Sequence, residues 1–489
     1  MLPHALYRCA QVQRFDQTAI QRFGIAGELL MERAGRFSFT QLQRQWPQAQ
    51  QVTVVCGAGN NGGDGYVIAR LAQQAGLDAV VLQLGDHHNL RGDARLNAER
   101  CASLRIPCEP FSKIPDRTHV IVDAVLGTGL QRDVTGAWAA ALRAINAHRA
   151  PVMAVDIPSG LNGDTGAVMG EAVRADLTAT FIALKQGMFT GQGADCCGAI
   201  LFDTLEIPAR LFATEILSAR RIDWRRQSLL LPERRPSAHK GDCGHLLIVG
   251  GARGFSGAAR LAGEGALRSG AGLVSVATAK QHAGMIAASR PELMCHGVAT
   301  PHELESLLRR CDVLAVGPGL GTGEWGKALF ECALASGKPL LVDADALNLL
   351  ARQPRYNDRW ILTPHPGEAA RLLGVTSERI QANRFAAAQQ LQQRYGGVIV
   401  LKGSGTLIQS PGQRTPAVCS DGNAGMATAG TGDVLSGVIA ALLAQGLSPS
   451  EAAETGVCLH AAAADLAAQQ GQRGMIAGDL FDPLRRLLS

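Results

Sequence analysis

The stretch that decides the fold of the C-terminal half reads Asn423-Ala424-Gly425-Met426-Ala427-Thr428-Ala429-Gly430-Thr431-Gly432-Asp433 and runs directly into the apolar segment Val434–Leu443. Glycines followed by a helix start expose backbone N–H groups that can hold an anion. Asp433 in the first turn has two interpretations. It can cap the helix, or it can be a base that deprotonates a hydroxyl attacking a phosphoryl group bound by those amides. The surrounding glycines favour the base.

Upstream of this motif, the strand predicted at Val398–Leu401 ends in Lys402-Gly403-Ser404-Gly405-Thr406. The glycine spacing differs from that of a Walker A loop, so P-loop chemistry is not expected. Lys402 and the backbone amides can still hold a nucleotide phosphate. Three further turns are Ser256-Gly257-Ala258, Gly317-Pro318-Gly319-Leu320-Gly321 and Thr363-Pro364-His365-Pro366-Gly367-Glu368. His365 lies between two prolines, so we predict an exposed site residue in a stiff turn.

Strands and helices alternate in both halves of the chain, which predicts α/β folds with parallel sheets and crossover helices. In the first half we expect a helical region over 5–45 that breaks at Gly24, helices over 66–75, 91–105 and 136–148, and strands at Val52–Val55, Ala79–Leu84, Val120–Val125, Val152–Val155, Leu177–Ile182 and Ala199–Phe202. In the second half we expect helices over 434–445 and 451–469, and strands at His245–Val249, Leu273–Ala277, Val313–Val316, Leu340–Val342, Trp360–Leu362 and Val398–Leu401. The intervening segment is rich in Arg and Pro, which predicts a domain over 1–215, a linker over 216–237 and a domain over 238–489.

The N-terminal half carries its own glycine-rich turn, Gly57-Ala58-Gly59-Asn60-Asn61-Gly62-Gly63-Asp64-Gly65, between a strand and a helix expected to start near Tyr66. The pattern differs from the usual dinucleotide fingerprint. Asn60, Asn61 and Asp64 add polar side chains to a loop that can approach a phosphate. These dense polar residues favour a binding loop over a simple tight turn.

Polar residues also follow two other strands of the N-terminal half. Asp123 precedes Gly127-Thr128-Gly129, and Asp156 precedes Pro158-Ser159-Gly160. Because the carboxyl ends of parallel strands form the ligand crevice, Asn61, Asp123, Asp156 and Ser159 are expected at one rim. Oxygen ligands of this kind suit a hard cation. Each Asp could instead cap its own turn, but the recurrence at successive strand ends favours a shared site.

The composition limits the function classes. The chain has 489 residues, a net charge of +5 and twelve cysteines without a CxxC pair. We therefore expect no nucleic-acid partner, and the Arg-rich stretch around residues 220–235 is interpreted as a solvated connector. No apolar run approaches the roughly 20 residues of a membrane span, and no signal core is visible. We expect a cytoplasmic protein with reduced thiols, and a homo-oligomer is left open.

The N-terminal motifs, together with Leu30-Met31-Glu32-Arg33-Ala34-Gly35 and Lys185-Gln186-Gly187, closely resemble the NAD(P)H-hydrate epimerase family over residues 5–208. The resemblance implies a Rossmann-like three-layer domain that inverts C6 of the hydrated nicotinamide ring. It implies that K⁺ is bound by Asn61, Asp123 and Ser159, and that Asp156 is the catalytic acid in contact with substrate. It also implies that substrate is held by Asn60, Asn61, Gly62, Gly63, Asp64, Gly127, Thr128, Gly129, Leu130, Gln131, Arg132 and Asp133.

The C-terminal motifs resemble the ribokinase-like fold over about 238–489, and closely its ADP-dependent NAD(P)H-hydrate dehydratase branch. The resemblance implies that Asp433 deprotonates the C6 hydroxyl for phosphorylation, after which phosphate and the C5 proton leave. ADP, or ATP in related enzymes, is expected together with Mg²⁺. The implied hydrate contacts are Ala258, Gly319, Gly321, His365 and Asp433. The implied nucleotide contacts are Lys402, Gly403, Ser404, Gly405, Thr406 and Gly432.

Together the two halves predict a bifunctional enzyme that repairs hydrated NADH and NADPH. Two alternatives remain at this stage. The C-terminal half could be a small-molecule or vitamin kinase, because its fold hosts many such activities. The N-terminal half could be a non-catalytic binding domain. A hydride-transferring dehydrogenase is less favoured, because neither glycine loop has the required fingerprint.

Overall fold

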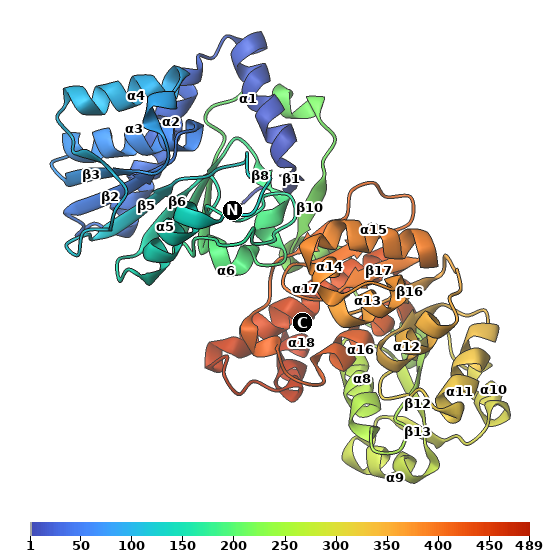
Figure 1. Cartoon of the computed structure of the whole chain (residues 1–489). Coiled ribbons are helices and arrows are strands. Elements are labelled where there is room, and N and C mark those ends of the chain that lie inside the picture. Colours follow the sequence, from blue (N-terminus) through green and yellow to red (C-terminus); the bar gives the residue numbers. More distant parts are fainter. Residues whose placement is uncertain (1) are drawn as a thin grey trace. The chain divides into compact units, whose positions relative to one another are not determined.

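The computed structural model describes residues 2–489, apart from the side chain of His87. The chain divides into two compact units, Met1–Arg220 and Arg221–Ser489, which Figure 1 shows in blue to green and in green to red. The division falls within β10 (Ala219–Ile222), and the predicted linker 216–237 also contains α7 (Trp224–Gln227) and the 3-10 helix η4 (Ser228–Leu230). Ile222 belongs to the apolar core of the second unit, and Trp224 and Leu231 pack against it.

The first unit is built on a parallel sheet with the order β4-β3-β2-β5-β6-β7-β9. Its strands are β2 (Gln51–Cys56), β3 (Asp78–Gln83), β4 (Cys108–Pro110), β5 (Val120–Ala124), β6 (Val152–Val155), β7 (Leu177–Phe181) and β9 (Ala199–Asp203). Its helices are α1 (Cys9–Phe23), α2 (Gly27–Gln45), α3 (Asn60–Gln74), α4 (Gly92–Ser103), α5 (Gly136–Ala147) and α6 (Gly193–Cys197). All six strands predicted for this half are confirmed, whereas the short β4 was missed.

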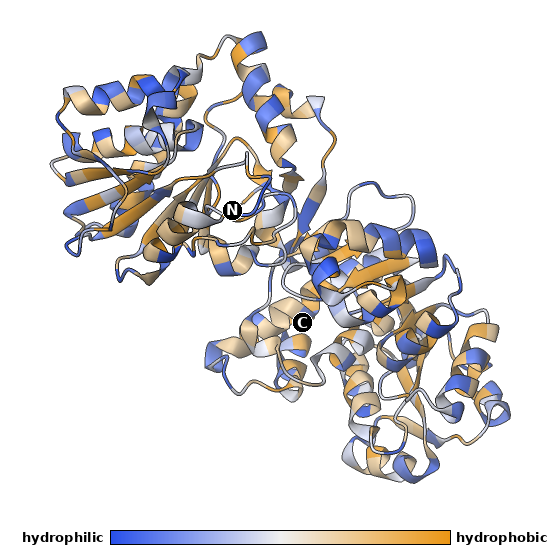
Figure 2. Cartoon of the chain, in the orientation of Figure 1, coloured by the Kyte–Doolittle hydropathy of each residue, from blue (hydrophilic) through white to orange (hydrophobic). Residues whose placement is uncertain are grey.

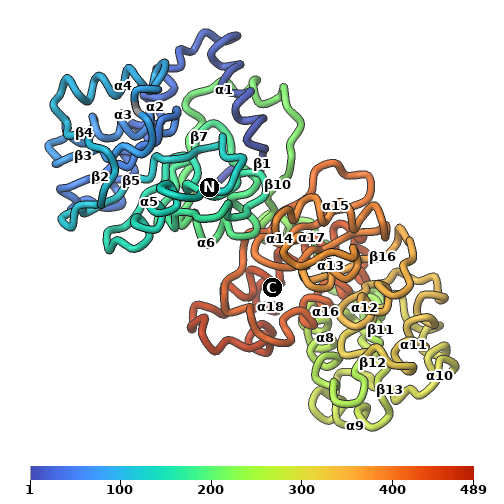
Figure 3. The backbone as a smooth tube through the Cα atoms, in the orientation of Figure 1, coloured from blue at the N-terminus to red at the C-terminus, as the bar shows by residue number. Residues whose placement is uncertain are grey.

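Apolar residues alternate between the two faces of this sheet, as successive strand side chains must. Val54 and Val122 pack with α2, α3 and α4 on one face. Val55 and Ile121 pack with α5 on the other. This gives the three layers expected of a Rossmann-like domain, with the most apolar colour in the strands (Figure 2). From β2 the chain passes to β3 and then to β4 at one edge of the sheet, and it then crosses to β5 on the other side of β2. The direction in which strands are added to the sheet therefore reverses between β2 and β5 (Figure 3).

Residues 5–7 contradict the prediction of a helix over 5–45. They form β1 (Ala5–Tyr7), which pairs parallel with β8 (Leu184–Lys185) and antiparallel with β10. Leu6 is fully buried there. Pairing with strands that are distant in sequence therefore overrides the local helical pattern, and the first helix begins only at Cys9. The pairing of Tyr7 with Lys185 also fixes the backbone at Lys185.

The second unit contains a sheet with the strand order β13-β12-β11-β14-β15-β16-β17-β18-β19. The strands are β11 (His245–Val249), β12 (Leu273–Thr278), β13 (Met294–Gly297), β14 (Val313–Val316), β15 (Leu340–Val342), β16 (Trp360–Leu362), β17 (Val398–Leu401), β18 (Thr406–Gln409) and β19 (Ala417–Cys419). Pairing is parallel from β13 to β17 and antiparallel from β17 to β19. The six predicted strands are confirmed, and β13, β18 and β19 were missed.

The longer helices of this unit are α8 (Ser256–Arg268), α9 (Lys280–Ser289), α10 (Pro301–Leu308), α11 (Glu324–Ala335), α12 (Ala344–Arg352), α13 (Pro366–Leu373), α15 (Arg384–Tyr395), α16 (Thr431–Ala444) and α17 (Pro449–Ala467). Two shorter ones are α14 (Ser377–Ala382) and α18 (Phe481–Leu487). Helix α16 is buried almost throughout. It packs closely on α8, because a Cβ atom at Gly437 would lie 1.9 Å from the Ala262 carbonyl oxygen.

This close approach predicts that Gly437→Ala destabilises the second unit. Overpacking a well-filled core costs about 1–3 kcal/mol, and here the obstacle is backbone that cannot rotate away. The matched control is Gly284→Ala in α9, where an added Cβ meets nothing within 4 Å and Ala is the better helix former. Urea unfolding of both variants checks this. Equal unfolding midpoints would show that the α8–α16 contact does not limit stability.

Candidate functional sites

The glycine turn of the first unit lies at the carboxyl end of β2, where the order of strand addition reverses. A Cβ at Gly57 would lie 2.0 Å from the Val125 carbonyl oxygen, and one at Gly62 would lie 2.0 Å from the Gly57 oxygen. Both positions therefore require glycine. Helix α3 begins at Asn60, not near Tyr66 as predicted. Its first intrahelical bond runs from the Gly63 N–H to the Gly59 oxygen. The preceding N–H groups have no intrahelical partner and can bind an anion.

The predicted cation residues Asp123 and Ser159 are in direct contact. The Ser159 hydroxyl donates to Asp123 Oδ1 at 2.6 Å, and the Ser159 N–H donates to Oδ2 at 2.8 Å. Burial raises the pKa of Asp123 to about 6, although the Ser159 hydrogen bonds act in the opposite direction. The third residue, Asn61, is buried against Gly127, and neither polar atom of its side chain has a hydrogen-bond partner among the described residues. Its carbonyl oxygen is thus available to a ligand.

Asp156 lies next to a residue that sequence reasoning did not place in the site. Lys185 is fully buried and forms an ion pair with Asp156. Its ammonium also donates to the Thr180 hydroxyl at 2.9 Å and to the Phe181 carbonyl at 3.1 Å. Asp156 has a positive φ of 67°, a strained conformation for a non-glycine residue that typically costs about 1–3 kcal/mol and clusters at functional sites. The only sequence signal for Lys185 was its place in the Lys-Gln-Gly pattern.

Asp64 belongs to the same acidic pocket. Burial, followed by the charges of Asp156 and Asp16, raises the pKa of Asp64 well above its usual range, and Lys185 opposes this only in part. Among the described residues the Asp64 carboxylate has no hydrogen-bond partner. Asp64 was not among the residues expected at the shared rim, and its electrostatic contact with Asp156 and Lys185 comes from the structure.

The glycine motif of the second unit forms the start of α16. Gly430 has a left-handed φ of 90°, and the Val434 N–H donates to its carbonyl at 3.0 Å. The N–H groups of Thr431, Gly432 and Asp433 therefore precede the first intrahelical bond and form the predicted amide-lined turn. Burial, and after it the charge of Asp343, raises the pKa of Asp433 to about 7, while Lys402 acts to lower it.

Lys402 is held by Asp343, which sequence reasoning missed. Lys402 Nζ donates to Asp343 Oδ1 at 2.7 Å, and the Ser436 hydroxyl donates to Oδ2 at 2.6 Å. Burial alone raises the pKa of Asp343, but the charge and hydrogen bond of Lys402 and the bond from Ser436 hold it below its ordinary value. A Cβ at Gly432 would lie 3.5 Å from Lys402 Nζ, so this cation reaches the amide-lined turn.

His365 and Glu368 cap helix α13. The Gly367 N–H donates to His365 Nδ1 at 3.0 Å, and the His365 N–H donates to Glu368 Oε2 at 2.8 Å. The imidazole is half exposed, as predicted, and burial together with Lys402 lowers the pKa of His365. Burial raises the pKa of Glu368 to about 7, against the effect of Lys402, whose Nζ lies 3.9 Å away. Glu368 links His365 to the Lys402 cluster.

Ala258 lies in the first turn of α8, and Gly319 and Gly321 lie in the loop that follows β14. Ala258 approaches Gly319, where an added Cβ would lie 3.2 Å from the Ala258 Cβ. The Gly321 N–H donates to Asp345 Oδ2 at 2.8 Å. The Lys402–Thr406 loop is held by the fully buried side chain of Arg384. Its guanidinium donates to the carbonyls of Leu401, Lys402 and Gly405. Its contribution to the loop was not predicted, because it comes from α15.

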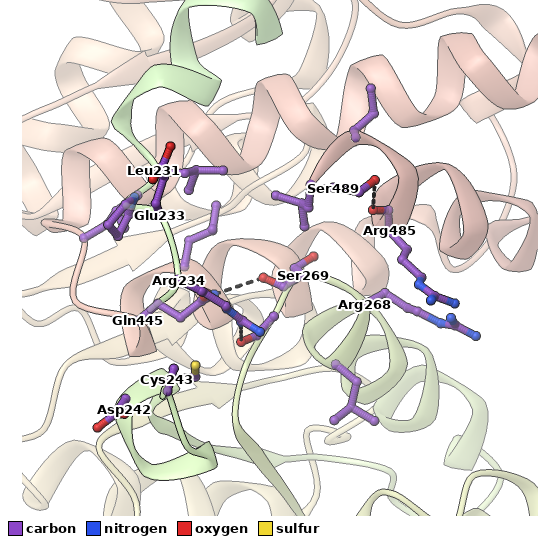
Figure 4. A pocket seen from close by; sticks show the side chains of 18 of the residues that line it. Leu231, Glu233, Arg234, Asp242, Cys243, Arg268, Ser269, Gln445, Arg485 and Ser489 are labelled. Carbon is purple, nitrogen blue, oxygen red and sulfur yellow. Dashed lines mark hydrogen bonds between the residues drawn. The ribbon is translucent and has the colours of Figure 1, made fainter. Parts of the chain in front are cut away.

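A cavity of about 1410 Å³ in the second unit is lined by none of the predicted site residues. Figure 4 shows it where α8 and α16 end, with Arg268, Ser269 and Gln445 at its wall. Gln445 Nε2 donates to the Ser269 carbonyl at 2.9 Å. Both helices begin at the glycine motifs and end here, so this cavity lies away from the Asp433 site.

Two family models match the chain, one in each half. A family model described as YjeF-related protein N-terminus matches residues 27–187, and one described as NAD(P)H-hydrate dehydratase matches residues 246–486. The bifunctional NAD(P)H-hydrate repair enzyme Nnr of Coxiella burnetii is 46% identical over 486 residues, which cover 99% of both chains. The chain belongs to the bifunctional NAD(P)H-hydrate repair enzyme family.

Other members and a solved structure agree. The bifunctional NAD(P)H-hydrate repair enzyme Nnr of Escherichia coli is 44% identical and covers all of this chain and 95% of its own. A ribokinase-like superfamily protein from Enterococcus faecalis is 29% identical with a TM-score of 0.51, over 56% of this chain and 96% of its own. The predicted family, the fold class and the enzyme class of this NAD(P)H-hydrate repair enzyme are therefore confirmed. No helix in the described range reaches the length and apolarity needed to cross a membrane.

Proposed function

We propose that the protein restores hydrated NADH and NADPH in two steps, one in each unit. The first unit interconverts the R and S hydrates at C6, and the second uses ADP to dehydrate the S epimer, with release of AMP and phosphate. The observation that carries the proposal is the position of Asp433, a partly buried carboxylate in the first turn of α16 beside the Thr431 and Gly432 N–H groups, where burial raises its pKa to about 7. A base near neutral pH suits proton removal from an alcohol.

In the second unit the C6 hydroxyl gives its proton to Asp433 while its oxygen attacks the terminal phosphoryl group of ADP. The N–H groups of Thr431 and Gly432 and the Lys402 ammonium face the negative charge that develops there. Phosphate then leaves C6 with the C–O electron pair, the C5 proton passes to the departing phosphate, and the C5–H electron pair forms the ring double bond. We assign hydrate contacts to Ala258, Gly319, Gly321 and His365, and nucleotide contacts to Lys402–Thr406 and Gly432.

Mg²⁺ is expected to enter with the nucleotide and to neutralise phosphate charge. Among the described residues no group of three His, Cys, Asp or Glu side chains forms a metal site. This fits an ion held mainly by phosphate and water oxygens, as Mg²⁺ often is.

We propose that the first unit binds K⁺ through Asn61, Asp123 and Ser159. The support is the unpartnered, buried side chain of Asn61 beside an Asp123 carboxylate that is desolvated and held by Ser159. Carboxylate, amide and hydroxyl oxygens are ligands that suit a hard cation. Asn60–Asp64 and Gly127–Asp133 are assigned to the substrate, with Asp156 as the acid–base group. A reducing compartment such as the cytoplasm fits the twelve free cysteines.

Two substitutions test the division of labour. Asp433→Asn removes the base, so dehydration should fall by about 100- to 10,000-fold while epimerisation continues. Asp156→Ala should stop epimerisation and leave dehydration of the S epimer intact. Both rates are measured on an epimer mixture, by recovery of dihydronicotinamide absorbance and by chromatographic separation of the epimers. Loss of both activities in either variant would contradict two independent sites. A phosphorylated product that accumulates without dihydronicotinamide would instead identify a kinase.

The pKa of Asp433 also predicts the pH dependence of dehydration. The base must be ionised, and its pKa is raised above the usual value, so activity is present above about pH 7 and is lost as the pH falls through that value. The kcat/KM profile of the wild type should therefore have an acid limb near pH 7. Glu368→Gln is the control, because the pKa of Glu368 is also raised to about 7. If Asp433 is the base, the acid limb of the kcat/KM profile should remain in this variant. A limb near the ordinary pKa of Asp would refute the assignment.

The cation site predicts that epimerisation is faster in K⁺ than in Na⁺ at equal ionic strength. The rate of dehydration should be the same in the two salts. Ser159→Ala should weaken the K⁺ response, because it removes the hydroxyl that holds Asp123. The titration uses epimerisation rate against K⁺ concentration for both proteins. An identical K⁺ response in the two would rule out this site.

A further inference from the structure

The loop between β17 and β18, Lys402–Thr406, folds around the side chain of Arg384. This arginine is the first residue of α15 and is fully buried. Its Nη2 donates to the carbonyl oxygens of Leu401, Lys402 and Gly405 at 3.1, 3.2 and 3.4 Å. Arginine stays charged at working pH, and its planar fork can serve several acceptors at once. A single cation therefore holds three carbonyl groups at this loop.

Gly403 lies directly against the guanidinium. A Cβ at Gly403 would lie 2.9 Å from Arg384 Nη1 and 3.2 Å from Nη2, so the arginine fills the space that a side chain would need. The Gly403 carbonyl in turn accepts from the Thr406 hydroxyl at 3.0 Å. The carbonyls of residues 401, 402, 403 and 405 are thus all engaged within the protein. A loop with its carbonyls engaged has N–H groups to offer, which suits an anion.

The direction of the Gly403 N–H follows from the planarity of the peptide bond. In a trans peptide the carbonyl and the following N–H point to opposite sides, and the described peptide bonds are trans. Because the Lys402 carbonyl points at Arg384, the Gly403 N–H points away from it. This N–H makes no backbone hydrogen bond within the range that the structure describes. It can therefore donate to a phosphate.

The same contact helps to fix Lys402. Its N–H donates to the Pro364 carbonyl at 2.9 Å, and its carbonyl accepts from Arg384. Its Nζ donates to Asp343 at 2.7 Å and lies 3.5 Å from where a Cβ of Gly432 would be. Arg384 thus supports the backbone of the residue whose ammonium reaches the start of α16.

We propose that Arg384 is a positioning residue for the nucleotide: by holding the carbonyls of the loop on one side, it presents the Gly403 N–H to a phosphate of ADP on the other. This role rests on the proposed function, in which the loop contacts ADP. A positive charge at the carbonyl ends also favours peptide dipoles whose N–H ends face the phosphate. The effect should fall on ADP affinity more than on the chemical step, because Asp343 holds the Lys402 ammonium independently.

The test measures the KM and the Kd of ADP with Mg²⁺ for Arg384→Met and Arg384→Lys in the full chain. Arg384→Met should raise both constants by about 10- to 100-fold, as expected for the loss of hydrogen bonds from a charged group. Its kcat at saturating ADP and its KM for hydrated NADH should stay within a few-fold of the wild type. Arg384→Lys should give intermediate constants, because an ammonium keeps the charge but lacks the fork.

Tyr395→Phe is the matched control. Tyr395 lies on the same helix, is also fully buried, and donates to the Leu372 carbonyl at 2.7 Å. Phenylalanine removes this bond and keeps the ring, so the urea midpoint should fall while the KM for ADP stays at the wild-type value. If Arg384 were only structural, Arg384→Met would give this same pattern, with less active enzyme and an unchanged KM, and the proposal would be wrong.

Gln381→Ala tests the same idea without disturbing the core. Gln381 is an exposed residue of α14, and its Oε1 accepts from Arg384 Nη1 at 3.0 Å. Removing this acceptor releases one edge of the guanidinium, so the KM for ADP should rise by about two- to ten-fold with kcat unchanged. This variant decides the matter if Arg384→Met does not fold.

The outcomes separate two failures. A wild type without ADP-dependent dehydration, or a Lys402→Met variant that binds ADP as tightly as the wild type, would overturn the proposed function of the loop. ADP-dependent dehydration with an unchanged Kd for ADP in Arg384→Met would overturn only the role of Arg384. An unchanged KM in Gln381→Ala would do the same where Arg384→Met does not fold.

Discussion

The ion pair between Lys402 and Asp343 is the interaction on which the second site depends. Removing two charges from water is expensive, and the cost is offset only where geometry and hydrogen bonds are good. Here Ser436 of α16 donates a hydrogen bond to the second oxygen of Asp343. Because Asp343 follows β15 and Lys402 follows β17, these contacts connect both strands to the helix that carries Asp433. Burial, and after it the charge of Asp343, raises the pKa of Asp433 to about 7, while Lys402 acts to lower it. The first unit repeats this arrangement with Lys185 and Asp156.

Each unit also places a glycine loop where the strand order of its parallel sheet reverses, between β2 and β5 in the first unit and between β11 and β14 in the second. There the carboxyl ends of neighbouring strands leave a crevice in which ligands bind, and glycine lets the loop approach the adjacent backbone. At Gly57 the neighbour is the Val125 carbonyl, and at Gly250 it is the Pro318 carbonyl, each about 2 Å from where a Cβ would be. The helix that follows each loop offers its first N–H groups to an anion. Two unrelated reactions can therefore use the same backbone device.

The twelve predicted strands and the glycine motifs could be found because hydrophobic period and turn residues are local properties, whereas β4, β13, β18 and β19 were missed. The strand at residues 5–7 was not predicted, since its partners lie near residues 184 and 220. The same reason explains why the buried charged residues Asp343 and Arg384 were not predicted from the sequence. Ser436 and its partner Asp343 are 93 positions apart, and Arg384 reaches its loop from another helix. Motifs identify residues that touch ligands, whereas the buried charges that tune those residues appear only in the fold. The roles of the individual site residues remain predictions.

The central claim is that Asp433 acts on a phosphoryl group held by the start of α16. A crystal structure of the protein with a nonhydrolysable ADP analogue and Mg²⁺ tests it most directly. We expect the terminal phosphoryl group within hydrogen-bond distance of the Gly432 N–H, with the Asp433 carboxylate facing the space where the ring hydroxyl would lie. A nucleotide bound elsewhere, for example in the cavity beside Arg268, or a carboxylate turned away from an ordered phosphoryl group, would contradict the account.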